Sequence, residues 1–222
     1  MSRVLYVISI CIFVFGCGQK KNSSIELKSA VEKDIAFFKA ESIEIANDTA
    51  MIKRFVMLIA PRAFRDEEFR VPYELLTKIG HKIYVASRDT VIAVGISGLA
   101  LKPQFSIKDI DTLKYDGLIL IGGTGAAIYW DDPTAHRLVQ YFTRTPNKII
   151  AAICIAPVTL ARAGVLAGIK ATVFEDKATI TDLKNKGALY EKADVVVSGN
   201  IITASGPAAS IEFAKAIALS VK

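Results

Sequence analysis

Short apolar runs rich in β-forming residues alternate along the chain with longer segments of helical periodicity. Five such runs lie at 55–60, 81–87, 117–123, 148–153 and 200–205. Helical patterns occupy 66–79, 133–144, 156–166 and 207–221. This alternation predicts an α/β protein with a mainly parallel sheet that carries helices on both faces. The stretch 90–104 has no helical pattern, and we interpret it as a hairpin or an edge pair of strands.

The size of the chain suits one such domain. It has 222 residues, of which 52% are hydrophobic and 23% are charged, so it can bury one substantial core. We place the domain at 51–222. The formal net charge of +6 is a mild excess without a dense basic run beyond Lys20 and Lys21, and we expect no nucleic-acid site.

The first 16 residues resemble a targeting segment. An apolar stretch at 4–15 follows Arg3 and is too short to span a bilayer, which is typical of a signal peptide, here placed at 1–16. The sequence "VFGC" that ends at Cys17 resembles the lipobox of bacterial lipoproteins, whose cysteine is acylated. We therefore expect a lipid-anchored protein of the cell envelope. An uncleaved anchor or a misassigned start codon is the alternative.

A polar tether at 17–50 would join the lipidated cysteine to the domain. Within it, Val31, Ile35 and Phe38 recur at helical spacing, so it has room for one amphipathic helix.

Cys154 is the cysteine that needs a functional explanation. The chain has three cysteines, and if Cys11 leaves with the signal peptide and Cys17 is acylated, Cys154 has no disulfide partner. It stands where the fourth apolar run ends, and Pro157 follows within the first turn of the next helix. We expect a tight strand-to-helix turn that holds the sulfur exposed in strained geometry, with its pKa lowered by the helix N-terminus. A buried, inert cysteine is the alternative.

Two further features fall at the same edge of the predicted sheet. Gly122 and Gly123 follow an apolar run, and the amide of Gly123 together with that of Ile155 could hold an oxyanion beside the thiol. Glu68 begins the helix after the first run, four residues before Pro72. A plain turn and ordinary helix-dipole compensation are the alternatives. We interpret Asp66, Glu67 and Glu175 as solvated surface charges.

Four motifs in order carry a resemblance to a known family. They are "FRDEEFRVPYELL", "LILIGGTG", "IIAAICIAPVTLARAGVL" and "IITASGPAASIEFAKAI", and together they resemble the ThiJ/PfpI superfamily, also called the DJ-one family, over roughly 53–222. The resemblance implies a flavodoxin-like three-layer sandwich of the class I glutamine amidotransferase type, usually a homodimer. It also implies that Cys154 is a reactive cysteine hydrogen-bonded to Glu68, with Gly123 and Ile155 as backbone donors. Glu67 would point about 100° away around the helix.

The sequence departs from the family pattern at two histidines. Hydrolytic members place a histidine directly after the cysteine, where this chain has Ile155. The DJ-one branch carries another histidine where "KATVFED" places Phe174. The two histidines present, His81 and His136, are not placed near the strand ends by the pattern. We expect no metal and no cofactor, because no His and Cys residues stand at ligand spacing and no dinucleotide fingerprint is complete.

The residues and the resemblance support three functional hypotheses. The first is an enzyme acting on small reactive carbonyls, in which Cys154 adds to an aldehyde and Glu68 moves protons. The second is a non-enzymatic sensor or binding module in which an oxidant modifies the same cysteine. The third and weakest is amide hydrolysis, because the thiol lacks its histidine partner.

Overall fold

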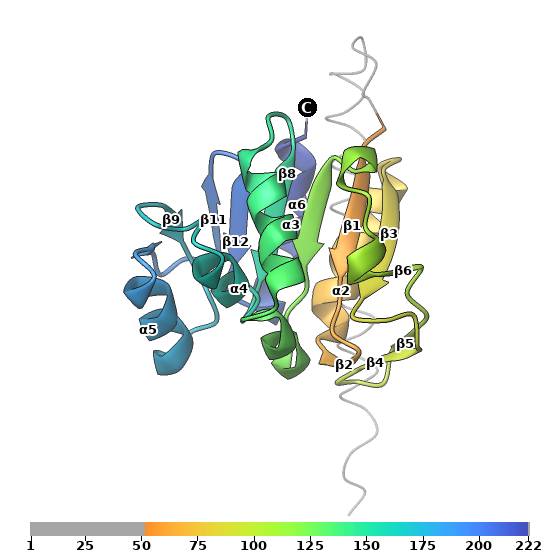
Figure 1. Cartoon of the computed structure of the whole chain (residues 1–222), viewed down its shortest axis with the longest axis horizontal. Helices are drawn as coiled ribbons and strands as arrows, with labels where there is room; N and C mark the ends of the chain where they lie inside the picture. Colours follow the sequence, from red (N-terminus) through yellow and green to blue (C-terminus); the bar gives the residue numbers. More distant parts are fainter. Residues whose placement is uncertain (1–51, 222) are drawn as a thin grey trace, which may run out of the picture.

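The computed structural model describes residues 52–221, and a seven-stranded sheet forms its centre (Figure 1). The expected signal peptide, the acylated Cys17 and the tether helix lie outside the described residues. The strand order is β11-β12-β8-β7-β1-β3-β6. Neighbouring strands are parallel except for β11 and β12, which are antiparallel. The predicted mainly parallel sheet is therefore confirmed.

Five of the seven strands follow the predicted apolar runs of the sequence, whereas the edge strands β6 and β11 lie outside those runs. The seven strands are β1 (Arg54–Leu58), β3 (Lys82–Ser87), β6 (Phe105–Ser106), β7 (Gly117–Leu120), β8 (Ile149–Ile153), β11 (Val195–Ser198) and β12 (Ile201–Ala204). Every residue of β7, β8 and β12 is buried, as expected for central strands covered on both faces.

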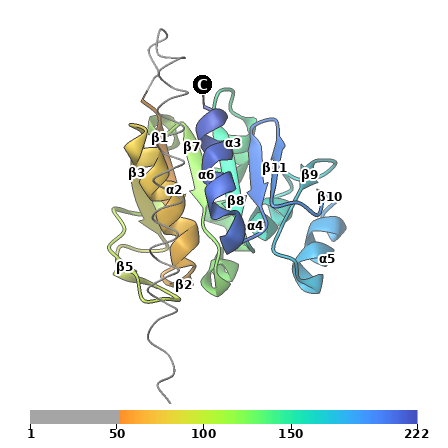
Figure 2. The ribbon, with the colours of Figure 1, turned by 180° about the vertical axis from the view of Figure 1, so that it is seen from behind.

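Helices cover both faces of the sheet and make a three-layer sandwich. One face carries α3 (Pro133–Arg144) and α4 (Pro157–Arg162), seen in front of the sheet in Figure 1. The other carries α2 (Asp66–Lys78) and α6 (Ser210–Leu219), seen side by side in Figure 2. The expected flavodoxin-like architecture is confirmed.

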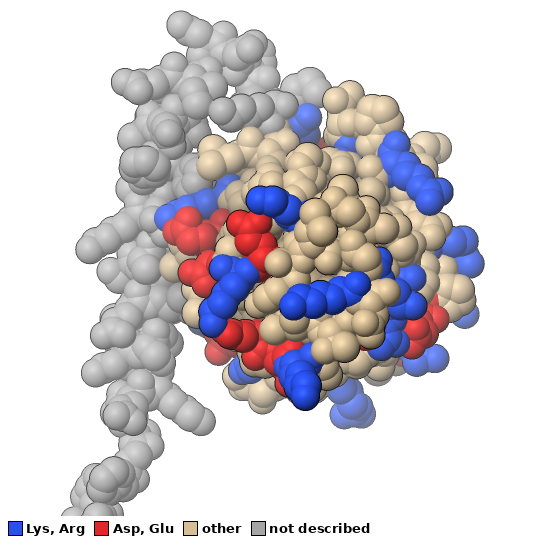
Figure 3. Space-filling model, turned by 90° about the vertical axis from the view of Figure 1, so that its left-hand side faces the viewer, with Lys and Arg blue, Asp and Glu red and all other residues tan. Residues whose placement is uncertain are grey.

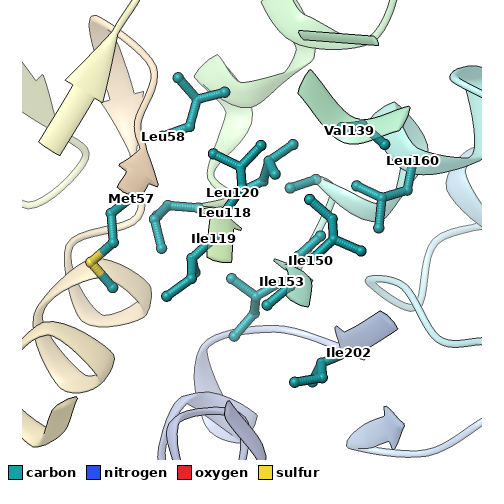
Figure 4. Packing of buried hydrophobic residues seen from close by; sticks show 14 of the residues in the cluster. Met57, Leu58, Leu118, Ile119, Leu120, Val139, Ile150, Ile153, Leu160 and Ile202 are labelled. Atoms are coloured by element: carbon teal, nitrogen blue, oxygen red, sulfur yellow. The ribbon is translucent and has the colours of Figure 1, made fainter. Parts of the chain in front are cut away.

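The hydrophobic core lies between the layers. In Figure 4, the side chains of Leu118, Ile119 and Leu120 on β7 lie between those of the flanking strands β1 and β8. Successive β7 side chains alternate between the two faces, so one short strand supplies apolar groups to both helix layers. Because the middle of the sheet is this tightly filled, only the strand ends leave room for polar chemistry.

The structure refines the predicted helices. The segment 156–166 contains a helix of only six residues, α4, because the chain turns at Gly164, which has a φ of 78°. The segment 207–221 begins with a 3₁₀ turn, η4 (Pro207–Ala209), before α6 starts. The predicted hairpin at 90–104 is confirmed as the antiparallel pair β4 (Ala93–Gly95) and β5 (Ala100–Leu101).

The hairpin joins a small second sheet instead of the central one. In that sheet, β4 also pairs with β2 (Arg62–Phe64), the strand that leads into α2. Asp66 holds the turn between β4 and β5, because its carboxylate accepts backbone N–H groups from Ser97 and Leu99 at 2.8 and 2.7 Å. The interpretation of Asp66 as a solvated surface charge was therefore wrong: the side chain is buried and structural.

Several short elements complete the described chain. They are η1 (Ile107–Asp109), η2 (Thr112–Lys114), η3 (Thr124–Tyr129), α5 (Lys177–Asn185) and the strand pair β9 (Lys170–Ala171) and β10 (Leu189–Tyr190). Within residues 52–221, no helix combines the length and the apolar character needed to cross a bilayer. Figure 3 shows Lys and Arg scattered among Asp and Glu on the side of the molecule where α5 lies, without a continuous basic surface there.

Candidate active site at the carboxyl end of the sheet

Cys154 occupies a strained turn between β8 and α4. Its φ is 64°, in the left-handed region that non-glycine residues seldom adopt. The turn is fixed on its strand side, because the N–H of Cys154 donates to the carbonyl of Ala204 at 2.9 Å and so continues the pairing of β8 with β12. The predicted sharp strand-to-helix turn is confirmed. It places the sulfur at the edge where the parallel strands end.

The sulfur is less accessible than we expected. Only 5% of the surface of Cys154 is exposed, so the expectation of an exposed thiol was wrong. Its neighbours close over it because the loops after β1 and β7 converge on the end of β8. A molecule that reacts with the sulfur must therefore be small, or these loops must open slightly to admit it.

Glu68 lies beside this cysteine, in the first turn of α2. Its side chain is fully buried, and one carboxyl oxygen, Oε2, accepts the N–H of Gly122 at 3.1 Å. The carboxyl group lies close enough to the Cys154 side chain for each group to shift the pKa of the other, and its second oxygen, Oε1, has no hydrogen-bond partner in the described chain. Pro72 lies inside α2 and cannot donate to the carbonyl of residue 68, yet the helix continues to Lys78. The structure thus brings together the two side chains that the sequence singled out.

Gly122 allows this close approach. A Cβ atom at this position would lie 2.5 Å from the Cβ of Cys154, 2.5 Å from Oε2 of Glu68 and 2.7 Å from the carbonyl oxygen of Ile153. None of the three can move away cheaply, because each belongs to a buried element. The glycine is therefore required here by space rather than by backbone conformation.

Two peptide groups direct their N–H groups at the sulfur, those of Gly123 and Ile155. A trans peptide points its C=O and N–H in opposite directions, so fixing the carbonyl also fixes the donor. The carbonyl of Gly122 accepts the N–H of Arg65 at 3.0 Å, and the carbonyl of Cys154 accepts the N–H of Phe174 at 2.8 Å. Both predicted donors are thus present, and each is held from behind by a distant segment of chain.

The electrostatics of the pair differ from our expectation. Burial, followed by the negative charge of Glu68, raises the pKa of Cys154 to about 12, although the N–H groups of Gly123 and Ile155 oppose this shift. The predicted lowering of the thiol pKa was wrong. With only six residues, α4 offers a weak dipole, and two amide donors do not offset the loss of hydration.

The same burial changes the carboxyl group. It raises the pKa of Glu68 to about 7, although its interaction with the Cys154 side chain and the positive charge of Arg65 oppose the shift. Near neutral pH, Glu68 therefore exchanges a proton readily, whereas the resting thiol keeps its own. The two groups titrate as a pair, because an ionised Glu68 disfavours the thiolate and a protonated one does not.

This shift predicts that raising the pH destabilises the protein. Between the usual pKa of 4.5 and the folded value of about 7, folded Glu68 holds a proton that the unfolded chain has released. Its contribution to stability is complete below pH 4.5 and is lost as the pH rises through 7, a loss of about 3 kcal/mol. Urea unfolding at a series of pH values measures the effect.

Glu68→Gln is the matched control for this prediction. The amide keeps the shape of the side chain and cannot titrate, while every other titrating group is common to both proteins. The difference in unfolding free energy between variant and wild type should therefore grow in favour of the variant from pH 4.5 to pH 8. A difference that stays constant over this range would contradict the assigned pKa.

Neither histidine contacts the thiol. His81 lies at the opposite end of the sheet, where its Nδ1 accepts the N–H of Lys53 at 3.3 Å and burial lowers its pKa. His136, on α3, places Nε2 2.7 Å from the carbonyl oxygen of Trp130. Glu175 is an exposed partner of Lys192, as expected. Glu67 is partly buried, and its Oε2 is shielded from solvent without a hydrogen-bond partner in the described chain, so the interpretation of this residue as a solvated surface charge was wrong.

Phe174 lies where the resemblance places a family histidine. The side chain is 42% exposed although it is aromatic. Its N–H donates to the carbonyl of Cys154 and so ties it to the turn between β8 and α4, which we call the elbow. One ring atom, Cδ2, lies 3.4 Å from the position of a Cβ on Gly206. Arg65 and Phe174 hold the donor peptides through their own backbone N–H groups alone. This role therefore leaves no signal in the sequence.

The arrangement agrees with what comparison with known proteins shows. The family model described as "DJ-1/PfpI family" matches residues 53–219. The Methanocaldococcus jannaschii protein MJ0967, itself uncharacterized, is 40% identical over 155 residues, which cover 69% of this chain and 75% of that protein. The protein called deglycase TK1284 from Thermococcus kodakarensis is 31% identical over 155 residues, or 68% of this chain and 90% of the relative.

A solved structure gives the same result for the fold. The crystal structure of a ThiJ/PfpI domain protein from Brachyspira murdochii superposes with a TM-score of 0.73 at 28% identity. The superposition covers 77% of this chain and 96% of that one.

Proposed function

Since the chain belongs to the DJ-1/PfpI family, we propose that it is a cysteine-dependent enzyme acting on small reactive carbonyls such as methylglyoxal, or on their adducts. The observation that carries the proposal is the geometry around Cys154: a strained thiol, a proton-exchanging carboxyl group and two fixed N–H donors at one point. The similarity to a protein called a deglycase supports the same class of chemistry.

The first step uses these groups directly. As the sulfur of Cys154 adds to the aldehyde carbon, the carboxylate of Glu68 accepts the thiol proton and the C=O electron pair moves onto oxygen. The N–H groups of Gly123 and Ile155 hold the resulting oxyanion. Protonated Glu68 then gives its proton to that oxygen, which leaves a neutral hemithioacetal.

A 2-oxoaldehyde can continue from this adduct. Glu68 removes the hydrogen of the former aldehyde carbon as a proton and returns a proton to the neighbouring carbon. It also carries the hydroxyl proton of the hemithioacetal to the former ketone oxygen, which completes the conversion into a 2-hydroxy thioester. Water then releases the 2-hydroxy acid and restores the thiol. The net reaction adds one water to methylglyoxal and gives lactate. Glu68 carries every proton in this scheme, because Ile155 and Phe174 cannot.

The proposal is tested with purified full-length protein and methylglyoxal. We expect loss of the dicarbonyl together with formation of lactate, continuing well past one equivalent of protein. Turnover that stops at one equivalent would show a thiol adduct without catalysis and would contradict the proposal. A slow rate is expected, because two proton-transferring histidines of the family are replaced here.

A second candidate, an oxidation sensor, is favoured by those same replacements. Peroxide would transfer an oxygen atom to Cys154 with release of water, giving a sulfenic acid, and a second equivalent would give a sulfinic acid. The donors at Gly123 and Ile155 suit the new oxygens. Mass spectrometry that finds two oxygen atoms on Cys154, in a protein without dicarbonyl turnover, would favour the sensor over the enzyme.

We also propose a lipid anchor and a homodimer. The anchor is supported by the sequence "VFGC" ending at Cys17, and it would hold the domain at a membrane of the cell envelope. The homodimer is supported by the family resemblance and by four exposed apolar side chains that are close in the sequence, those of Val91, Ile92, Val94 and Ile96, because a surface that carries them favours an apolar partner. A second copy of this chain is a suitable cover for such a surface.

A further inference from the structure

Trp130 contacts the elbow at the residue that follows Cys154. It follows η3, the segment that begins directly after Gly123, and it is the only tryptophan in the sequence. Its indole Nε1 donates to the carbonyl of Ile155 at 3.2 Å. This contact is therefore a side-chain hydrogen bond from the β7 loop to the residue that supplies one of the two donors.

With this contact, both peptide groups that flank Ile155 are held by hydrogen bonds. On one side, the peptide that carries the Ile155 N–H is held through the carbonyl of Cys154 by Phe174. On the other side, the carbonyl of Ile155 is held by Trp130, with the N–H of Val158 as its second donor at 3.2 Å. Fixing both peptide planes leaves Ile155 little freedom to rotate, so its N–H stays directed at the sulfur.

The indole ring is itself held in place. The guanidinium carbon of Arg162, the last residue of α4, lies over the ring at 5.1 Å from its centroid. Arg162 in turn pairs with Asp131 at 2.6 Å and with Asp182 of α5 at 2.5 Å. The backbone carbonyl of Trp130 is in contact with Nε2 of His136 at 2.7 Å. The indole thus packs against an arginine that two ion pairs hold in place, so the ring is well suited to keep a fixed orientation.

We propose that Trp130 is a positioning residue for the candidate active site, and that its Nε1 keeps the N–H of Ile155 directed at the Cys154 sulfur and at any oxyanion formed there. The inference deepens the proposed function and rests on it only for the oxyanion. The effect of Trp130 on the reactivity of the Cys154 thiol is expected whether or not the protein turns over a carbonyl.

Trp130→Phe tests the proposal, because it keeps an aromatic ring over Arg162 and removes the donor. In the full-length protein, the rate at which iodoacetamide alkylates Cys154 should fall about fivefold at a given pH, the effect of one lost hydrogen bond. The whole pH profile of alkylation should move to higher pH. If methylglyoxal is turned over, kcat should fall by a similar factor while KM changes little.

Tyr129→Phe is the matched control. The neighbouring side chain is buried, and its hydroxyl donates to the carbonyl of Ile59 at 2.9 Å and not to a residue of the turn that carries Cys154. It should lower stability without changing the alkylation profile. Equal alkylation of Trp130→Phe and wild type at every pH would overturn the proposal, and so would an equal fall in Tyr129→Phe.

Arg162→Gln provides a second variant in case Trp130→Phe does not fold. It leaves the indole donor in place and removes the charge that braces the ring, so alkylation should slow in the same direction by a smaller factor. An unchanged rate in a folded Arg162→Gln protein would then overturn the proposal. Absence of methylglyoxal turnover in the wild type, with the alkylation differences present, would contradict the proposed function and leave this inference standing.

Discussion

Replacing Cys154 by serine is expected to reduce methylglyoxal turnover by a factor of roughly 10³ or more while leaving the fold intact. A hydroxyl is smaller than a thiol, fits the same turn, and can donate to the buried carboxyl of Glu68. It is nevertheless a far weaker nucleophile, and Glu68 cannot remove its proton near neutral pH. Lactate formation and circular dichroism of both proteins measure the two parts of the prediction.

The other cysteines supply the control for this experiment. Free thiols bind dicarbonyls stoichiometrically, and protein purified without signal cleavage and acylation keeps Cys11 and Cys17 as free thiols, which would add to the substrate loss. A Cys11→Ser/Cys17→Ser protein keeps Cys154 alone and should retain the turnover rate of the wild type. Sustained lactate formation by Cys154→Ser would refute the role of this thiol.

Gly122→Ala is expected to have the second largest effect, although it adds a single methyl group. The methyl would lie 2.5 Å from both the Cβ of Cys154 and Oε2 of Glu68. Relief requires that the elbow and α2 separate, which breaks the contact between thiol and carboxyl. We expect turnover to fall about 10²-fold or more, because such sites tolerate little misplacement, and stability to fall by about 1–3 kcal/mol.

Gly199→Ala separates the steric effect from a general loss of stability. Gly199 lies in the turn between β11 and β12 at a φ of 62°, and no atom lies within 4 Å of an added Cβ. The alanine should cost about 1 kcal/mol of backbone strain without touching the site. If both variants lost stability alone and kept full turnover, the close packing at Gly122 would have no role in the chemistry.

Most of the central sheet could be predicted from the sequence, because buried parallel strands read as continuous apolar runs. The edge strand β11 could not be recognised in this way, since its side chains are only partly buried. A hairpin signal was present, however: the β-branched run 195–197 is followed by a glycine turn and then by β12. The helix α5 carries only two buried residues, Thr179 and Leu183, which is too weak a periodicity to stand out.

In the site, too, some features follow from the local sequence and others depend on tertiary contacts. The positions of Cys154, Glu68, Gly123 and Ile155 follow from strand ends and motif order, and the structure brings all four together. The pKa of the thiol does not follow, because it is set by how closely the loops cover the sulfur. The buried role of Asp66 was missed for a similar reason, since its partners lie in a hairpin formed far along the chain.

The two donor peptides are held by amides from distant parts of the chain, one before α2 and one after β9. During synthesis, residue 154 therefore leaves the ribosome before the segment that completes its surroundings. Until that segment has docked, the sulfur behaves as an ordinary cysteine in water, open to any electrophile or oxidant nearby. Chemical selectivity is thus acquired late in folding, and a chain that stalls earlier exposes an unprotected thiol.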